Sequence, residues 1–370
     1  MLLKRPVLFA AVTAMIFLTS MTGCGTRTIT PSLAQSESEQ TAQVQNAESL
    51  DVKTITSKGS DKEAVNHNNV TREETQIGAN PVTENTTVSE IINDPAFGDF
   101  GRLLFPVDRT VTGDMTLADI SSSNVYVWYS DIKKEKTVEI VNDLKSRAEN
   151  GETIFYSIYS EQEMASDPSK KDTGLFFFKG EPGAKFAVMN AGGGFMYVGA
   201  MHDSFPHALE VSKKGYNAFA LIYRPDDPYT DLAQAIAFIY DNADELEVDP
   251  EGYSLWGGSA GARMAAALGN GDSMAAYGRP DIPQAAAVIM QYTGYSAVSG
   301  KDAPTYACVG TNDGIASWRT MQSRLQTLDS YGIPTEFHAY EGLSHGFGLG
   351  TGTVADGWIN DAVAFWENQM

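Results

Sequence analysis

The chain has 370 residues and a mass of 40.0 kDa, and 47 acidic against 26 basic residues give it a formal net charge of −21. A chain this acidic repels phosphate backbones, so we expect no nucleic-acid partner. Its single long apolar run lies at the extreme N-terminus, which excludes a multi-span membrane protein, and two cysteines cannot form a disulfide-rich scaffold.

The N-terminal segment predicts export. A basic pair precedes the apolar residues 7–18, a stretch too short for a membrane span. The Met-Thr-Gly run before Cys24 resembles the lipobox of bacterial lipoproteins, although that family prefers Leu where Met21 stands. The resemblance implies a signal peptide at 1–23, a lipid on Cys24, and an exported protein anchored to the outer face of a bacterial membrane. The alternative is an ordinary cleaved signal with an incidental cysteine.

A polar tether is predicted between the lipid and the folded part. Residues 24–92 are rich in Ser, Thr, Asn, Gln and Glu, and no aromatic residue occurs from 18 to 96. Such a segment buries too little apolar surface to offset its ordering entropy, so we expect it to be disordered. The folded domain then spans 93–370, with an N-terminal extension at about 97–150. That extension matches no motif, and it either lengthens the domain or forms a partial cap over its site.

The folded part alternates between strand-like and helical patterns. After a helix predicted at 138–148, the predicted strands are 153–158, 174–178, 186–189, 218–223, 253–256, 286–291, 305–310 and 335–340. The predicted helices between the later strands are 204–214, 231–246 (with Asp231 as its N-cap), 260–268, 317–331 and 355–369. This alternation predicts an α/β fold with a mostly parallel sheet covered by helices on both faces, and a site at the carboxyl ends of its strands.

One motif in this pattern carries nucleophilic chemistry. Gly257-Gly258-Ser259-Ala260-Gly261 is G-x-S-x-G, placed between a predicted strand and a predicted helix. A sharp turn there presents the Ser259 hydroxyl above the sheet, and the small residues at 257 and 261 let strand and helix approach closely. A serine hydroxyl is a weak nucleophile near neutral pH, so an adjacent base is needed.

A base and a carboxylate occur at the matching end of the sheet. His345 lies in the loop between the last predicted strand and the last predicted helix. Asp313 directly follows the strand 305–310 and is the predicted carboxylate that orients the imidazole, whereas Asp302 precedes that strand. The order Ser259, Asp313, His345 is the order of catalytic residues in the α/β-hydrolase fold.

A glycine-rich loop can supply hydrogen-bond donors to this site. The run Asn190-Ala191-Gly192-Gly193-Gly194 begins where the strand 186–189 ends, and its backbone N–H groups carry no shielding side chains. Such a loop can hold the oxyanion of a tetrahedral intermediate or cradle a phosphate. The run lacks the spacing of nucleotide-binding loops, which favours the oxyanion interpretation, with the N–H of Ala260 as a further donor.

Together these motifs resemble those of the α/β-hydrolase superfamily, and in particular its bacterial esterases of the hormone-sensitive-lipase-like and carbohydrate-acetylesterase-like kinds. The resemblance covers about 185–350 and includes the glycine run followed by Phe195, the Tyr223-Arg224 pair, and the His-Gly-Phe run at 345. From the Tyr-Arg pair we expect structural support beneath the site.

The resemblance implies specific oxyanion donors, namely the backbone N–H groups of Gly193, Gly194 and Ala260. One position departs from the family pattern: Ala191 stands where the family often has a His that braces the loop. Asn190 is the candidate substitute for that His.

The expected activity is that of a serine carboxylic-ester hydrolase acting through an acyl-enzyme on Ser259, with short-chain esters as substrates and acetylated carbohydrate as a candidate. We expect a small ester or acylated carbohydrate as the only partner apart from the membrane that holds the lipid anchor, and no cofactor.

A metal site is disfavoured because His202 and His207, five residues apart, fall on different helix faces. Cys308, in an apolar run, is expected to be a small buried residue and not a nucleophile. Two alternatives stay open: a peptidase or other acyl transferase on the same fold, and a surface lipoprotein that only binds a ligand.

Overall fold

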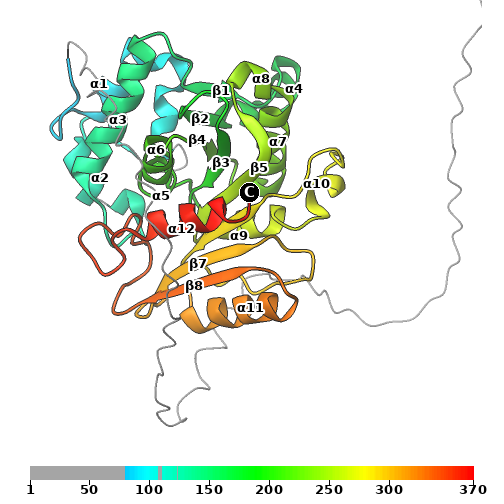
Figure 1. Ribbon diagram of the computed structural model, residues 1–370. Helices are drawn as coiled ribbons and strands as arrows, with labels where there is room; N and C mark the ends of the chain where they lie inside the picture. Colours follow the sequence, from blue (N-terminus) through cyan, green and yellow to red (C-terminus); the bar gives the residue numbers. More distant parts are fainter. Residues whose placement is uncertain (1–79, 107–110, 123) are drawn as a thin grey trace, which may run out of the picture. The chain divides into compact units, whose positions relative to one another are not determined.

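The computed structural model describes residues 80–106, 111–122 and 124–370 (Figure 1). The predicted signal peptide, Cys24 and most of the predicted tether lie outside the described residues. Among the residues described, no helix is long and apolar enough to cross a membrane.

The order of elements alternates strands with helices, as predicted. The strands are β1 (Phe155–Ser157), β2 (Gly174–Phe178), β3 (Lys185–Asn190), β4 (Asn217–Ile222), β5 (Asp249–Gly258), β6 (Ala287–Gln291), β7 (Thr305–Gly310) and β8 (Thr335–Tyr340). The α-helices are α1 (Val88–Ile92), α2 (Leu117–Ser122), α3 (Lys134–Glu149), α4 (Glu161–Ser166), α5 (Ala200–Asp203), α6 (Phe205–Lys213), α7 (Pro228–Asp241), α8 (Ala243–Leu246), α9 (Ala260–Leu268), α10 (Ser273–Ala276), α11 (Trp318–Ser330) and α12 (Trp358–Glu367). Short 3₁₀ helices are η1 (Pro95–Leu104), η2 (Asn124–Tyr126) and η3 (Pro168–Asp172).

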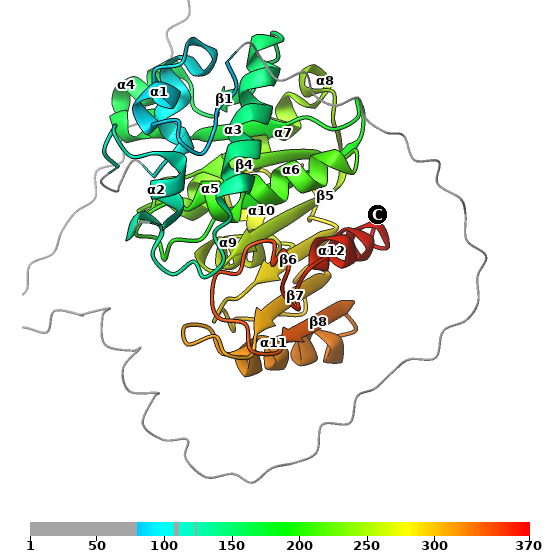
Figure 2. The same cartoon turned by 90° about the vertical axis from the view of Figure 1, so that its left-hand side faces the viewer.

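In the described part of the chain the strands form one eight-stranded sheet in the order β1-β2-β4-β3-β5-β6-β7-β8. The first two pairings, β1 with β2 and β2 with β4, are antiparallel, and all pairings from β4 to β8 are parallel. Helices α3, α6 and α12 lie on one face of the sheet and α7, α9 and α11 on the other (Figures 1 and 2). The carboxyl ends of the parallel strands therefore meet at one edge, where the loops that carry the predicted site begin.

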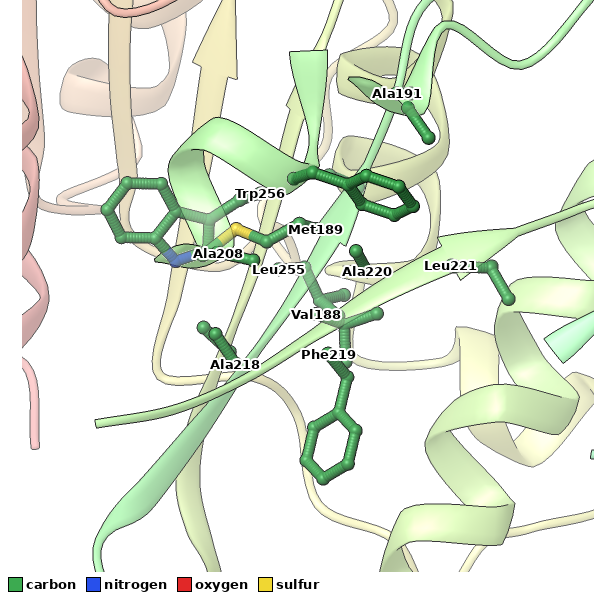
Figure 3. Packing of buried hydrophobic residues seen from close by; sticks show 14 of the residues in the cluster. Val188, Met189, Ala191, Ala208, Ala218, Phe219, Ala220, Leu221, Leu255 and Trp256 are labelled. Atoms are coloured by element: carbon green, nitrogen blue, oxygen red, sulfur yellow. The ribbon is translucent and has the colours of Figure 1, made fainter. Parts of the chain in front are cut away.

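The core is densest around the central strands. Every residue of β4 is buried, because helices cover both faces of the sheet at this strand. For the same reason its sequence is an almost continuous apolar run and does not alternate. The register pairs Val188 with Phe219 and Leu255 on one face, and Met189 with Trp256 on the other. Figure 3 shows these side chains together with those of neighbouring strands and α6. This packing fixes where β3 and β5 end, and thus where the next loops start.

The second predicted helix differs from the observed one at both ends. Helix α7 begins at Pro228, whose fixed φ suits the first position of a helix, and not at Asp231. The predicted N-cap role of Asp231 is therefore wrong. Its buried carboxylate lies in the first turn and accepts hydrogen bonds from the hydroxyl of Tyr159 (2.5 Å) and the backbone N–H of Arg224 (2.6 Å). The helix ends at Asp241, and α8 follows as a separate turn.

The folded part begins earlier than the predicted boundary at residue 92. Val82 exchanges two 2.8 Å hydrogen bonds with the side chain of Asn142 on α3, and Val88 and Ile91 of α1 are buried. The end of the predicted tether is thus incorrect by about a dozen residues, because these few apolar residues stand too far apart in a polar stretch to form a recognisable pattern.

Candidate active site

Ser259 lies in a sharp turn between β5 and α9. Its backbone has φ +51° and ψ −113°, a strained conformation for a residue with a side chain. A Cβ on Gly257 would lie 2.2 Å from the carbonyl carbon of Gly261, and a Cβ on Gly261 would lie 1.9 Å from the carbonyl oxygen of Asn190. Glycine is therefore required at both positions, which is the reason the motif predicted a close approach of strand and helix here.

The structure brings together the three side chains that the sequence singled out. The Nε2 atom of His345 lies 3.0 Å from Oγ of Ser259, and its Nδ1 atom lies 2.8 Å from Oδ2 of Asp313. The other oxygen of Asp313 accepts backbone hydrogen bonds from Ile315 (2.8 Å) and Ala316 (2.7 Å), so its carboxylate has a fixed orientation. Such a chain can pass the serine proton to the imidazole and stabilise the resulting positive charge.

The alternative carboxylate, Asp302, takes part in a separate cluster. It forms an ion pair with Arg324 at 2.8 Å and accepts a hydrogen bond from Asn270 at 2.8 Å. These contacts tie the chain that precedes β7 to Asn270, which follows α9, and to α11. The carboxylate beside His345 is thus Asp313, which follows β7, and not Asp302, which precedes it.

The glycine loop after β3 presents backbone donors. Gly193 has φ +122°, and a Cβ there would lie 2.1 Å from the carbonyl oxygen of Tyr197, so the loop closes only with glycine. In the described part of the chain, no acceptor bonds the backbone N–H of Gly193, Gly194 or Ala260. Ala260 is the first residue of α9, where a backbone N–H has no partner within the helix. These three groups are available to a developing negative charge.

A residue that sequence reasoning missed, Asp203, braces this loop. Its carboxylate accepts hydrogen bonds from the backbone N–H of Gly192 (2.6 Å) and from the hydroxyls of Tyr129 (3.1 Å) and Tyr292, and it is 1% exposed. A Cβ on Gly192 would lie 2.8 Å from this carboxylate, and one on Gly258 would lie 2.3 Å from it. The carboxylate therefore lies directly against the loop and the serine turn, where glycines at 192 and 258 leave room for it.

The tyrosines around Asp203 remain hydrogen-bond donors. Burial, reinforced by the negative charge of Asp203, raises the pKa of Tyr129 and of Tyr292 well above the ordinary value. Both hydroxyls therefore stay protonated at neutral pH and keep pointing at the carboxylate. The ring of Tyr292 also packs edge-on against His345, with centroids 5.0 Å apart, so the same cluster contacts the base.

Asn190 does not play the bracing role suggested for it. Its side-chain amide donates to the carbonyl of Trp256 (2.8 Å) and so ties β3 to β5 instead of holding the loop. The loop is held by Asp203 and by the hydroxyl of Tyr223, which donates to the carbonyl of Ala191 at 2.8 Å. The expectation that the Tyr-Arg pair supports the site agrees with this contact.

Residues 125–130, here called the 125–130 segment, are the part of the predicted extension that contacts the site. The backbone N–H of Ser130 donates to the carbonyl of Gly346 (3.0 Å), next to His345, and the hydroxyl of Tyr197 donates to the carbonyl of Val127. The indole of Trp128 stacks on the ring of Tyr197 at 5.9 Å. Of the two roles considered for the extension, the 125–130 segment fits that of a partial cap.

Backbone strain is concentrated around this site. Among the described residues, five without the freedom of glycine have a positive φ, and four of them belong to the elements just described: Trp128, Phe195, Ser259 and Tyr292. Each such residue costs roughly 1–3 kcal/mol, and such residues persist where the surrounding structure holds them, commonly at functional sites.

The two histidines that follow the loop are buried and uncharged. Burial lowers the pKa of His202 to about 3, and it also lowers the pKa of His207. The ring of His202 packs edge-on against Tyr126, and that of His207 against Trp358.

His202 also lines a cavity of about 260 Å³ between α3, α6 and the loop after Phe347. In the ranges described, no group of three or more His, Cys, Asp or Glu residues is arranged to hold a metal ion.

A second cavity opens beside the glycine loop. It has a volume of about 230 Å³ and lies at the carboxyl end of β4, lined among others by Val198, Tyr223, Arg224 and Phe105. Arg224 is fixed there by Asp231, with contacts down to 2.6 Å, and this pairing raises its pKa. The cavity thus lies at the end of β4, the strand that pairs with β3, whose end carries the glycine loop.

Comparisons with known proteins agree with this architecture. A family model described as BD-FAE matches residues 179–315. The acetyl ester-xyloside bifunctional hydrolase from Caldicellulosiruptor lactoaceticus is 20% identical, with a TM-score of 0.51, over 58% of this chain and 95% of that one. The chain has an α/β-hydrolase fold.

Two further solved structures are similar at lower scores. An esterase from the planctomycete Thermogutta terrifontis is 22% identical over 53% of this chain and 89% of that one, with a TM-score of 0.48. The α/β-hydrolase enzyme MGS-M1 from a Medee basin deep-sea metagenome is 20% identical over 53% and 92%, with a TM-score of 0.46. A comparison with curated proteins gives no match.

Proposed function

We propose that the protein is a serine carboxylic-ester hydrolase in which Ser259 is the nucleophile, His345 the general base and Asp313 the carboxylate that orients it. The observation that carries the proposal is the continuous chain from Ser259 Oγ to His345 Nε2 (3.0 Å) and from His345 Nδ1 to Asp313 (2.8 Å). It lies beside three backbone donors with no other acceptor among the described residues.

The proposed reaction proceeds through an acyl-enzyme. Ser259 Oγ attacks the ester carbonyl while Nε2 of His345 removes the hydroxyl proton, and the carbonyl oxygen becomes an oxyanion facing the N–H groups of Gly193, Gly194 and Ala260. The carbon–oxygen bond of the ester then breaks, and the alcohol leaves with the proton held by His345. Water repeats the sequence on the acyl-enzyme, releasing the acid and restoring Ser259.

We further propose short-chain esters as substrates, with acetyl groups on carbohydrate as the leading candidate. Support comes from the BD-FAE match over 179–315 and from the fold shared with an enzyme named as an acetyl ester-xyloside hydrolase. The N-terminal pattern ending at Cys24 supports an exported, lipid-anchored enzyme, which would meet esters outside the cell.

The test is hydrolysis of 4-nitrophenyl acetate by the purified protein beside two variants. Ser259→Ala removes the proposed nucleophile, and Ser323→Ala changes an exposed serine on α11 as a matched control. The proposal predicts that Ser259→Ala loses at least about a thousandfold in kcat while the control keeps the wild-type rate. Equal rates in all three proteins would overturn it, and a folded wild type without activity on any short-chain ester would favour the binding protein.

A further inference from the structure

Trp128 is an exposed aromatic residue at the mouth of the proposed active site. Its side chain is 43% exposed although large apolar side chains are mostly buried in this fold, and its backbone has a positive φ of +79°. A residue with a side chain adopts that conformation only where its surroundings impose it. The surrounding contacts therefore hold the indole in a defined position, in which it remains accessible.

Two contacts place Trp128 between the glycine loop and the loop that carries His345. A Cβ on Gly194 would lie 3.0 Å from the indole, and a Cβ on Gly346 would lie 2.4 Å from the carbonyl oxygen of Trp128. Gly194 carries one of the proposed oxyanion donors, and Gly346 directly follows His345. One ring face stacks on Tyr197, which keeps the indole plane fixed.

The position of Trp128 indicates which part of an ester substrate contacts the indole. In the tetrahedral intermediate the oxyanion faces the loop donors, the leaving oxygen faces Nε2 of His345, and the acyl group takes the remaining direction. Trp128 lies against Gly194, which carries a proposed donor, and against Gly346, which follows the base His345. It is therefore on the side of the site that holds the oxyanion and the leaving oxygen. The group that meets the indole is then the alcohol part of the ester and not its acyl chain.

We propose that Trp128 determines substrate specificity by stacking on a ring in the alcohol part of the ester, either a pyranose or an aromatic ring. A rigid indole face is suited to a flat ring face and gains little from a short flexible chain. Two further exposed apolar residues, Met196 (61%) and Ile315 (59%), follow the glycine loop and Asp313 in the chain. The inference rests on the proposed esterase function and names the alcohol class it acts on.

The recognition element belongs to this chain's own N-terminal part. Trp128 lies outside residues 179–315, where the family model matches, and reaches the site only because the 125–130 segment packs on the two loops. The specificity for the alcohol can therefore differ from that of proteins that share only the matched part.

The experiment compares the full-length wild type with Trp128→Ala, Trp128→Phe and Tyr331→Ala on three acetates. The acetates share one acyl group and differ in the alcohol: ethyl acetate, 4-nitrophenyl acetate and a mono-acetylated methyl pyranoside. Tyr331, 55% exposed at the end of α11, is the control for loss of an exposed aromatic side chain. Ester hydrolysis is followed by acid release so that all three acetates have the same readout.

We expect Trp128→Ala to raise KM about five- to tenfold for the ring esters and by less than about twofold for ethyl acetate, which has no ring to stack on the indole. Trp128→Phe should recover most of that loss, and Tyr331→Ala should match the wild type. A larger effect on the pyranoside than on the aryl ester identifies the sugar as the preferred ring. Equal losses on all three acetates, or no loss on any, would overturn the proposal.

A binding measurement separates this inference from the proposed reaction. In the Ser259→Ala background, equilibrium binding of the same ring esters requires no turnover. We expect a further Trp128→Ala change to weaken that binding about five- to tenfold. If it has no effect, the role of Trp128 is refuted even if Ser259 proves to be the nucleophile. If binding weakens but the wild type hydrolyses none of the esters, only the proposed reaction fails.

Discussion

Replacing Asp203 tests how the glycine loop is held in place. The carboxylate is 1% exposed and accepts hydrogen bonds from Gly192, Tyr129 and Tyr292, three residues from separate parts of the chain. Asp203→Ala leaves all three donors buried and without their acceptor. Asp203→Asn keeps the volume and one carbonyl oxygen, which can still accept from Gly192 and Tyr129, while its amide group faces the hydroxyl oxygen of Tyr292.

The expected magnitudes follow from these contacts. A buried donor that loses its partner costs about 1–3 kcal/mol, and removing a buried charge returns part of that loss because the charge no longer needs to be desolvated. For Asp203→Ala we expect the free energy of unfolding to fall by about 3 kcal/mol, and for Asp203→Asn by about 1 kcal/mol. Loss of one oxyanion donor lowers kcat by about a hundred- to a thousandfold. A loosened Gly192 misplaces the donors that follow without removing them, so we expect a ten- to hundredfold loss in the Ala variant and less than tenfold in the Asn variant.

The assay pairs urea unfolding with kcat for 4-nitrophenyl acetate at saturating substrate. We expect the Ala variant to lose both stability and kcat, and the Asn variant to recover most of each. An Ala variant with kcat within twofold of the wild type and an unfolding free energy within about 0.5 kcal/mol would refute it, since surface substitutions have effects of that size. Loss of stability with full kcat would show that Asp203 supports the fold but does not position the loop.

Three further predictions rest on other residues. Burial lowers the pKa of His202 to about 3, against 6.5 in an unfolded chain, so only the unfolded state binds a proton at this residue as the pH falls through 6.5. His202 should therefore lower the free energy of unfolding by about 2 kcal/mol between about pH 8 and pH 5. If His202→Gln has the same dependence of unfolding free energy on pH as the wild type, this prediction is contradicted. Gly261→Ala places a Cβ 1.9 Å from the backbone oxygen of Asn190 and should lower the free energy of unfolding by at least about 3 kcal/mol or prevent folding. Gly294→Ala, which has open space around the added Cβ, should leave the free energy of unfolding unchanged in the same denaturation assay. Cys308 is fully buried, and burial raises its pKa, so native protein should not be alkylated there by iodoacetamide while urea-unfolded protein is; peptide mapping that finds alkylation of the native protein would show that the residue is accessible.

Much of the fold could be predicted because local pattern and tertiary environment agree. Strands β2 and β7 and helix α9 have the predicted bounds, since their apolar runs end at glycines or polar residues. Ser259 was identified from its G-x-S-x-G motif, and Asp313 and His345 were chosen by the rule that sites form where parallel strands end. This rule needs only the order of strands and loops, which a sequence shows directly.

The remainder depends on contacts between parts of the chain far apart in sequence. Asp203 lies 11 residues from Gly192 but accepts from tyrosines 74 and 89 residues away, and no local pattern marks such a partner. The role of Trp128 depends in the same way on packing against Gly194 and Gly346. The N-cap prediction at Asp231 failed for a related reason, because a distant tyrosine and Arg224 use its carboxylate.

The most direct test of the central claim is covalent labelling of the nucleophile. The protein is treated with a serine-directed organophosphate, digested, and the modified peptide is identified by mass spectrometry, with His345→Ala as the control that lacks the base. We predict one adduct, on Ser259, formed in step with loss of esterase activity and slowed at least about a hundredfold in the control. An adduct on another residue with Ser259 unmodified, or labelling at the same rate without His345, would contradict the account.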